Sequence, residues 1–217
     1  MKAEIIAVGS ELLTPDSSDT NSLYLTRALN ESGCDVHLKT IVGDDQSNIE
    51  DILRQALERS DLVIFSGGLG PTMDDVTRAA VATVLGKPLI LKQELLEELR
   101  AKFSSRGFTM SKNNERQAEI IEGAEILENR WGTAPGMWIA HAGRHIVLLP
   151  GPPRELQSMF ESSAIPRIRK ISGTTRLAHR SFYVTGMTES ELDSEIAPLY
   201  TAHPAIRTTA SRQRCIV

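Results

Sequence analysis

The chain has 217 residues, which is enough for one sizeable domain, or for one domain and a small appendage. Hydrophobic residues make up 41% and charged residues 24%, so an ordinary globular core is expected. The formal net charge of −4 argues against non-specific nucleic-acid binding and against a basic membrane-binding surface.

The sequence has no apolar run of the length needed to cross a bilayer, and no basic segment stands ahead of a signal-type stretch at its start. Its two cysteines, Cys34 and Cys215, form no CxxC pattern and are expected to be reduced thiols. These features predict a cytoplasmic protein with neither a membrane nor a nucleic acid as its partner.

The first part of the chain alternates strand and helix patterns. Apolar or alternating runs predict strands at residues 4–8, 36–42 and 62–65. Helical periodicity follows each of them, and Ser47 with Glu50 has the spacing of a capping box at the second helix. The order βαβαβα predicts a parallel sheet with helices on both faces.

Three glycines follow the third predicted strand in the stretch SGGLGPTMDDVT, at Gly67, Gly68 and Gly70. Glycines let backbone N–H groups approach a phosphate, and the start of the next helix favours an anion. The stretch lacks the Gly-Lys-Ser/Thr ending of a Walker loop and carries Asp74 and Asp75 instead. Carboxylates beside a phosphate indicate a divalent cation between them. The alternative is a tight turn in which Asp74 or Asp75 caps the helix.

Two further turns are expected at the same edge of the sheet, because ligands of parallel sheets lie beyond the carboxyl ends of the strands. Glu11 follows the first predicted strand. The segment Pro150–Pro153 follows a strand predicted at residues 145–149 and is a third candidate wall of one pocket. The structural alternative for that segment is a rigid proline turn.

The middle of the chain is predicted to hold a short strand at residues 89–91, a helix from about 95 to 107, and a polar helix that starts near Ser111. Lys112 and Arg116 are four residues apart and are expected on one face of that helix. Alternatively, these two cations belong to a solvated helix face.

The last third begins with a predicted hairpin that joins strands at residues 137–140 and 145–149 through Ala142-Gly143. Farther on, the sequence predicts a strand around Phe182 to Thr185, a helix capped by Thr188 and Glu191, and another strand from Ile206. These elements are too few to bury much alone, so they are expected to be part of a second small domain.

Four stretches together resemble the CinA family of molybdopterin-binding-like domains. They are VGSELL at residues 8–13, Thr20-Asn21, SGGLGPTMDDVT at residues 66–77, and LPGPPREL at residues 149–156. The resemblance implies a three-layer α/β/α sandwich with a mostly parallel sheet at residues 1–172. It also implies a partial α+β KH-like linker domain at residues 173–217, and a homodimer or larger homo-oligomer. CinA proteins usually carry a further domain that deamidates nicotinamide mononucleotide, and nothing in this sequence corresponds to it.

The resemblance further implies metal-dependent hydrolysis of the diphosphate of ADP-ribose, a small-molecule nucleotide. The cofactor would be a divalent ion, with Mg, Mn, Co and Ni left open, assisted by K⁺. On this interpretation Asp74, Asp75 and Glu11 are catalytic and hold the metal. The implied substrate-binding residues are Gly67, Gly68, Gly70, Thr72, Thr77, Asn21, Lys112, Arg116, Pro152 and Glu155.

Two other classes of function stay open. One is a molybdopterin-binding or adenylylating protein like MogA or MoaB. That branch usually has GGTG where this chain has Gly67-Gly68-Leu69-Gly70. The other is a non-catalytic module that senses a nucleotide.

Overall fold

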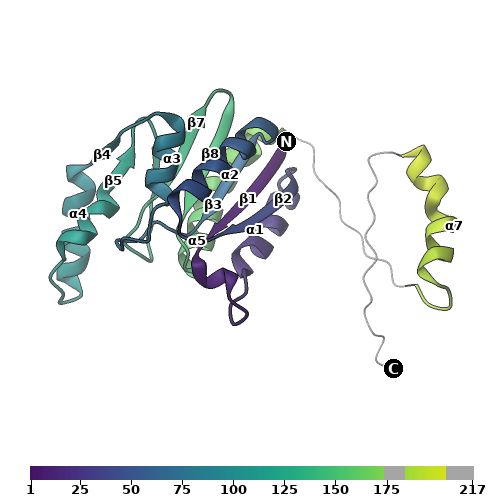
Figure 1. Ribbon diagram of the computed structural model, residues 1–217, viewed down its shortest axis with the longest axis horizontal. Helices are drawn as coiled ribbons and strands as arrows, with labels where there is room; N and C mark the ends of the chain where they lie inside the picture. Colours follow the sequence, from purple (N-terminus) through teal and green to yellow (C-terminus); the bar gives the residue numbers. More distant parts are fainter. Residues whose placement is uncertain (174–183, 204–217) are drawn as a thin grey trace. The chain divides into compact units, whose positions relative to one another are not determined.

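A six-stranded sheet with the order β2-β1-β3-β8-β7-β6 forms the centre of the first unit (Figure 1). The computed structural model describes residues 1–173 and 184–203, and the chain divides into two units, residues 1–178 and 179–217. The strands of the sheet are β1 (Lys2–Val8), β2 (Asp35–Val42), β3 (Leu62–Ser66), β6 (Glu125–Leu127), β7 (Gly136–His141) and β8 (Arg144–Leu149). The first three strands and β8 pair in parallel, and β7 and β6 add antiparallel pairs. The predicted α/β class with a mostly parallel sheet is confirmed.

Helices cover both faces of this sheet. The helices on one face are α1 (Thr20–Glu31), α5 (Pro153–Met159) and α6 (Ile165–Ser172), and those on the other are α2 (Gln46–Arg59) and α3 (Thr77–Leu85). Consecutive strand residues point to opposite faces, so Ile5 packs with the first group and Ile6 with the second. Fully burying each such side chain contributes about 1.5–3 kcal/mol, which explains why the central strands are nearly all apolar.

A smaller layer follows α3. In it β4 (Leu89–Leu91) pairs antiparallel with β5 (Glu119–Ile121), a strand that the sequence did not reveal. The other elements of this layer are α4 (Gln93–Ser105) and the 3₁₀ helix η2 (Lys112–Ala118). The prediction that Lys112 and Arg116 share a helix face is wrong, because a 3₁₀ helix has about three residues per turn.

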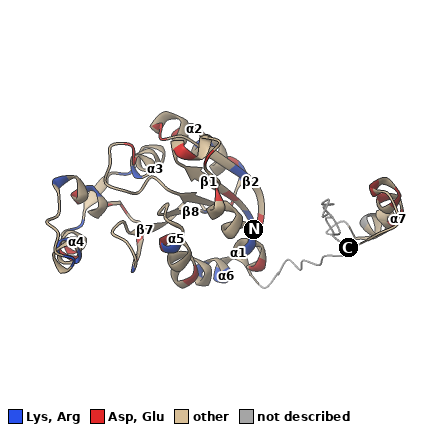
Figure 2. Ribbon diagram, turned by 90° about the horizontal axis from the view of Figure 1, so that it is seen from below, with Lys and Arg blue, Asp and Glu red and all other residues tan. Residues whose placement is uncertain are grey.

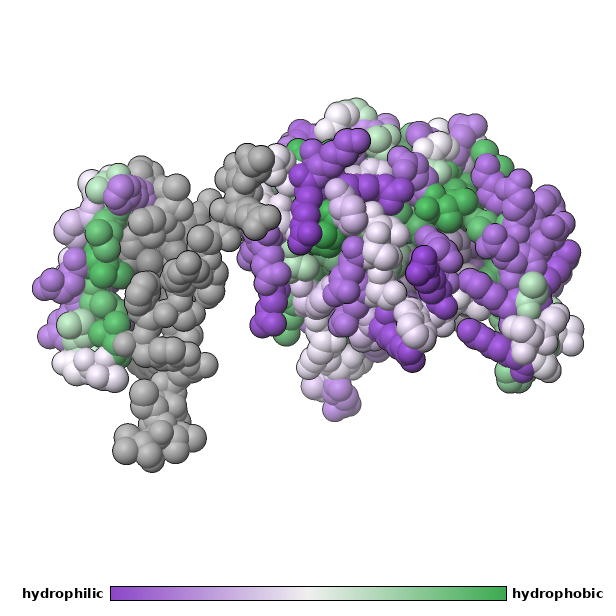
Figure 3. Space-filling view, turned by 180° about the vertical axis from the view of Figure 1, so that it is seen from behind, coloured by the Kyte–Doolittle hydropathy of each residue, from purple (hydrophilic) through white to green (hydrophobic). Residues whose placement is uncertain are grey.

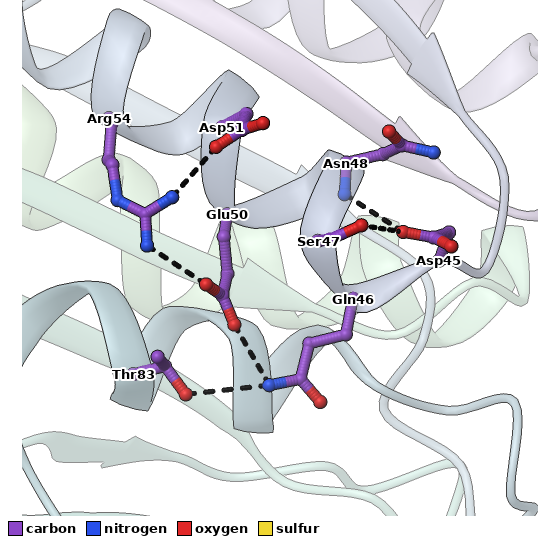
Figure 4. A network of polar contacts seen from close by, with 8 residues as sticks. All are labelled: Asp45, Gln46, Ser47, Asn48, Glu50, Asp51, Arg54 and Thr83. Carbon is purple, nitrogen blue, oxygen red and sulfur yellow. Dashed lines mark hydrogen bonds and ion pairs between the residues drawn. The ribbon is translucent and has the colours of Figure 1, made fainter.

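The start of α2 differs from its prediction by two residues. Asp45, not Ser47, is the N-cap, and its Oδ1 accepts hydrogen bonds from Asn48 N at 2.9 Å and from Ser47 Oγ at 2.5 Å (Figure 4). These bonds lower the pKa of Asp45. Glu50 accepts instead from Gln46 Nε2, so the capping box predicted there is wrong. An aspartate suits the N-cap because its carboxylate satisfies free N–H groups at the positive end of the helix.

The hairpin predicted between β7 and β8 is confirmed, since Ala142 and Gly143 both have positive φ in the connection. The capping box of Thr188 and Glu191 is confirmed as well, at the start of α7 (Glu189–Ala202). Hydrophobic surface is visible along α7 (Figure 3), and Leu199 is 54% exposed.

The strands predicted on either side of α7 are tested only in part. The described residues Val184 and Thr185 form no strand, so that part of the prediction is wrong. Phe182 and Ile206 lie outside the described residues. The KH-like domain and the boundary at residue 172 therefore remain predictions.

Charged side chains of both signs are distributed over the helices of the first unit (Figure 2). The carboxylate of Glu4 is fully buried in β1 and is held by Arg59 through two bonds of 2.8 and 3.0 Å and by Ser60 Oγ at 3.0 Å. Within residues 1–173 and 184–203, none of the helices has the length and apolar character that spanning a bilayer requires.

His145 makes the stability of the fold depend on pH. Its ring lies 5.3 Å from the ring of Trp138, its Nδ1 is buried without a hydrogen-bond partner among the described residues, and burial lowers its pKa. The unfolded chain therefore binds a proton more readily than the folded chain below the ordinary histidine pKa of about 6.5. This contribution to stability is present above that pH and is lost as the pH falls below it.

We expect the melting temperature of a His145→Phe variant to fall less than that of the wild type between pH 7.5 and pH 5, because phenylalanine keeps a ring beside Trp138 but cannot be protonated. Thermal unfolding followed by circular dichroism measures both curves. Parallel curves would show that His145 makes no such contribution.

Candidate functional site

Three turns leave the sheet at one edge. In the parallel register Ala7 lies opposite Ser66, and Ser66 lies opposite Leu149, so β1, β3 and β8 end side by side. Gly67 N donates to Leu149 O at 3.0 Å, and a Cβ on Gly67 would collide with the carbonyl oxygen of Val8. The predicted convergence of the turns near residues 10, 70 and 152 is therefore present.

A fourth loop reaches the same edge. Leu127 at the end of β6 lies opposite Gly136 at the start of β7, and Met137 lies opposite Leu148. The loop at residues 128–135 is therefore next to the turn that follows β8. Sequence reasoning missed it, because the placement depends on two antiparallel pairings that the strand pattern alone does not specify.

Asn21 joins two of these turns. It lies in the first turn of α1, and its Nδ2 donates to Ser66 Oγ at 3.0 Å and to Gly151 O at 2.7 Å. Its Oδ1 is buried and has no hydrogen-bond partner among the described residues. The structure thus places Asn21 at the predicted edge, where it fixes the end of β3 against the turn after β8.

Asp75 stabilises the loop at residues 67–76 between β3 and α3, the glycine loop, by accepting hydrogen bonds from within it. Its Oδ1 accepts from Gly70 N at 2.8 Å, and its Oδ2 accepts from Thr72 N at 2.8 Å and from Thr72 Oγ1 at 2.6 Å. The alternative of a helix-capping aspartate is wrong, because Val76 is the N-cap of α3 and no side chain caps it. Gly70 is required here, since a Cβ on it would lie against the Asp75 carboxylate.

Thr77 holds the other side of the loop. It is fully buried, its Oγ1 donates to Gly67 O at 3.0 Å, and its N–H donates to Gly68 O at 3.3 Å. Gly68 has φ +68°, and a Cβ there would collide with Thr77 Oγ1. The N–H of Gly68 donates to no protein group in the described part of the chain, so it is available to a ligand.

The carboxylates of Glu11 and Asp74, which belong to the turns at this edge, accept no hydrogen bond from other described residues. Glu11 lies in the short 3₁₀ helix η1 (Ser10–Leu13), is exposed, and its carboxylate covers the backbone of Gly9. Asp74 is exposed and makes no hydrogen bond or ion pair with other described residues.

The residues at this edge suit a divalent ion that binds together with a phosphate ligand. Across residues 1–173 and 184–203, no three His, Cys, Asp or Glu side chains are grouped to hold a metal. A protein-only cage is therefore not preformed. Mg²⁺ usually binds one or two carboxylates together with substrate phosphates and water, and two uncommitted carboxylates suit that arrangement.

Arg116 and Lys112 are placed differently from each other. Arg116 Nη1 donates to Thr72 O at 2.7 Å, so it contacts the glycine loop through a carbonyl group. Lys112 is exposed and makes no polar contact with other described residues. The structure therefore brings one of the two predicted cations to the loop.

Arg78, which sequence reasoning missed, lies beneath the glycine loop. It is only 2% exposed, and its guanidinium donates to Leu69 O at 2.5 Å and to Gly70 O at 3.0 Å. No carboxylate lies within ion-pair distance of it in the described ranges. Burial, followed by the charge of Arg116, lowers the pKa of Arg78 to about 10. The sequence does contain one indication that Arg78 is special, because it is the one charged residue in the otherwise largely apolar helix TRAAVATVL.

Glu155 and Pro152 mark the turn after β8. Glu155 Oε2 accepts from Asn129 Nδ2 at 2.7 Å, and a Cβ on Gly132 would collide with the same carboxylate. Glu155 thus fastens the loop at residues 128–135 to α5 rather than facing an open pocket. Pro152 is exposed and is the N-cap of α5.

Comparisons of the sequence with known proteins identify its family. Residues 4–170 match a family model described as "Probable molybdopterin binding domain", MoCF_biosynth. A CinA-like protein of Solibacter usitatus is 47% identical over 209 residues, which are 96% of this chain and 50% of that protein. A CinA-like protein of Koribacter versatilis is 47% identical over 96% of this chain and 51% of its own length. The chain thus spans about half the length of these relatives.

Solved structures show the same relationship. The protein CinA from Thermoplasma acidophilum is 33% identical, with a TM-score of 0.72 over 77% of this chain and 99% of that one. A molybdopterin biosynthesis protein from Mycobacterium abscessus has a TM-score of 0.53 at 20% identity, over 79% of this chain and 93% of that one, and shows the shared fold alone. The chain therefore belongs to the CinA-like branch of the MoCF_biosynth family of molybdopterin-binding-type domains.

Proposed function

We propose that this chain hydrolyses the diphosphate bond of ADP-ribose with the help of a divalent metal ion. The observation that supports this most is the meeting of the turns after β1, β3 and β8 at one edge, with the Gly68 N–H uncommitted. A diphosphate needs backbone donors close to it, and glycines permit that approach.

The reaction adds water to one phosphorus and breaks the bridging P–O bond, which gives AMP and ribose 5-phosphate. A divalent ion bound with the substrate would neutralise the diphosphate charge and activate the water. Glu11 and Asp74 supply the carboxylates that hold the ion, since neither has a protein partner among the described residues. A K⁺ ion that assists them belongs to the same proposal.

The other residues of the edge have supporting tasks. Asp75 and Thr77 keep the glycine loop in the shape that presents Gly68, and Asn21 keeps the turn at Gly151 beside it. Arg116 fixes the loop at Thr72 and adds positive charge beside it. Positioned groups of this kind lower a barrier because they need no reorganisation when charge develops in the transition state.

The test incubates the full 217-residue chain with ADP-ribose and Mg²⁺, Mn²⁺, Co²⁺ or Ni²⁺, with and without K⁺. Chromatography measures the formation of AMP and ribose 5-phosphate. We expect both products with at least one metal and neither in EDTA. The absence of product with every metal would refute the proposal.

An Asp74→Asn variant is expected to hydrolyse ADP-ribose about 10-fold more slowly at a limiting metal concentration, with most of the loss restored by excess metal. The side chain is exposed and bonded to nothing described, so the fold should not change. Glu97→Gln is the matched control, a carboxylate on α4 that is also exposed. Equal rates for both variants would remove Asp74 from the metal site.

Molybdopterin binding is the second candidate, and the shared fold with molybdopterin biosynthesis proteins is the observation that favours it. Calorimetric titration with molybdopterin and with ADP-ribose separates the two. The third candidate, a nucleotide-sensing module without catalysis, would be favoured by tight ADP-ribose binding without hydrolysis under any metal condition.

A further inference from the structure

Trp131 is an exposed tryptophan whose ring is fixed in place. It is 48% exposed, yet its backbone N–H donates to Asn129 Oδ1 at 3.1 Å and its ring Nε1 donates to Ser158 Oγ at 3.1 Å. The guanidinium of Arg154 lies 3.5 Å from the ring centroid. Rings held in this way lose little conformational freedom when a ligand binds, so they favour tight contact.

The support beneath Trp131 is itself buried. Asn129 is 4% exposed, accepts from Gly132 N at 2.8 Å, and donates to Ala134 O at 2.8 Å and to Glu155 Oε2 at 2.7 Å. Its side chain thus ties the loop to α5. The ring position is therefore determined by the same helix that begins at the turn after β8.

A shallow hollow of about 520 Å³ adjoins the ring. Its walls combine one aromatic ring with cationic, anionic, amide and hydroxyl groups: Trp131, Arg154, Gln157, Ser158, Glu161 and Ser162. The α5 residues and those that follow are three or four positions apart, so they share one side. Such a lining offers a planar surface for stacking and both donors and acceptors around it.

The order of the strands shows where this hollow lies relative to the glycine loop. Along the sheet edge, Glu11 follows β1, the glycine loop follows β3, and the turn at Gly151 follows β8. The loop at residues 128–135, which contains Trp131, joins β6 to β7 next to that turn. Arg154 is only three residues beyond Gly151. A ligand with its diphosphate at Gly68 and Gly151 thus points one end toward Glu11 and the other toward Trp131.

We propose that Trp131 and Arg154 bind the purine base of the nucleotide, an inference that rests on the proposed function. Bases stack on tryptophan rings and on arginine guanidinium planes alike, and this pair presents both. Gln157 lines the same hollow and can exchange hydrogen bonds with the edge of the base. Ser158 Oγ and Glu161 Oε1 already accept hydrogen bonds from Trp131 Nε1 and the Tyr24 hydroxyl, so they contribute through their remaining acceptor capacity. The ribose 5-phosphate half then lies toward Glu11.

Tryptophan fluorescence tests the contact directly, because the chain has two tryptophans and Trp138 is only 5% exposed. Titration with AMP is expected to quench the emission, whereas ribose 5-phosphate, which has no base, should not. The quenching should persist in Trp138→Phe and disappear in Trp131→Phe. Quenching that survives in Trp131→Phe would overturn the proposal.

Affinity gives a second readout. Trp131→Ala is expected to weaken AMP binding by about 5- to 150-fold, the range that loss of one base–aromatic stack produces. Trp131→Phe should retain most of the affinity, and ribose 5-phosphate should bind all three proteins equally. An unchanged AMP affinity in Trp131→Ala would refute the base site.

The outcomes also separate this inference from the proposed function. If the wild type hydrolyses ADP-ribose and Trp131→Ala does so with the same KM, the base site is refuted while the hydrolase proposal stands. If AMP quenches Trp131 but ADP-ribose is never hydrolysed, the base site stands and the hydrolase proposal is refuted.

Discussion

Replacing Asp75 with alanine is expected to slow ADP-ribose hydrolysis by about 10²- to 10³-fold. It should also lower the free energy of unfolding by about 2–4 kcal/mol, since hydrogen bonds to a charged group contribute ~1.5–3 kcal/mol each and water replaces part of them. The carboxylate accepts three hydrogen bonds from Gly70 and Thr72, which together keep the loop folded back on itself. Without them the Gly70–Thr72 side of the loop is no longer held, and the bonds from Thr77 alone keep Gly68 in place.

The neighbouring residue, Asp74, provides the control for the stability effect of this variant, although not for its rate. Asp74→Ala removes an equal charge from an exposed side chain that is bonded to nothing described, so its stability should change by no more than about 0.5 kcal/mol. Urea unfolding and initial rates measure both variants. An Asp75→Ala protein that keeps the full hydrolysis rate would remove Asp75 from the mechanism.

Arg78→Met is expected to weaken ADP-ribose binding by about 30- to 150-fold, equivalent to roughly 2–3 kcal/mol. Arg78 is a buried cation whose hydrogen bonds, among the described residues, go to the carbonyl oxygens of Leu69 and Gly70. A buried charge without a direct ion-pair partner is costly, because the nearby charges of Asp75 and Glu119 offset its burial only in part, and an anionic ligand at the loop would balance it further. Arg78 is therefore expected to matter more to the complex than to the free protein.

The Arg78→Lys variant distinguishes the effect of the positive charge of Arg78 from the effect of its two hydrogen bonds to the loop. Lysine keeps the positive charge but lacks the fork that reaches two carbonyl groups, so part of the affinity should return. Arg106→Met, at the exposed end of α4, is the matched control and should bind as the wild type does. Calorimetric titration with ADP-ribose measures all three, and wild-type affinity in Arg78→Met would contradict the role of its charge.

The elements that the sequence predicted well have strong local signals. β1 from Ile5 to Val8 and β3 from Leu62 to Phe65 are runs of buried apolar residues, and the turns after them contain the glycines that close backbone approach requires. The three-residue strand β5 was missed because it is too short to show a period of two. The start of α2 was misplaced by two residues because Asp45 and Ser47 are both suitable caps.

The sequence predicted where the candidate site lies better than it predicted what each side chain does there. Strand order places Glu11, Asn21 and the glycine loop at one edge, but the task of each side chain depends on contacts that no spacing reveals. Asp75 is predicted to hold a metal, and that role stays a prediction; the structure adds that its carboxylate accepts hydrogen bonds from its own loop. Arg78 was overlooked because its partners are backbone carbonyl groups, which every sequence contains.

The most direct test of this account is a crystal structure of the chain with Mg²⁺ and an ADP-ribose analogue in which a methylene group replaces the bridging oxygen of the diphosphate. The account predicts the diphosphate within hydrogen-bond distance of Gly68 N, the ion between it and Glu11 or Asp74, and the base against Trp131. A diphosphate bound away from the turns after β1, β3 and β8 would contradict it.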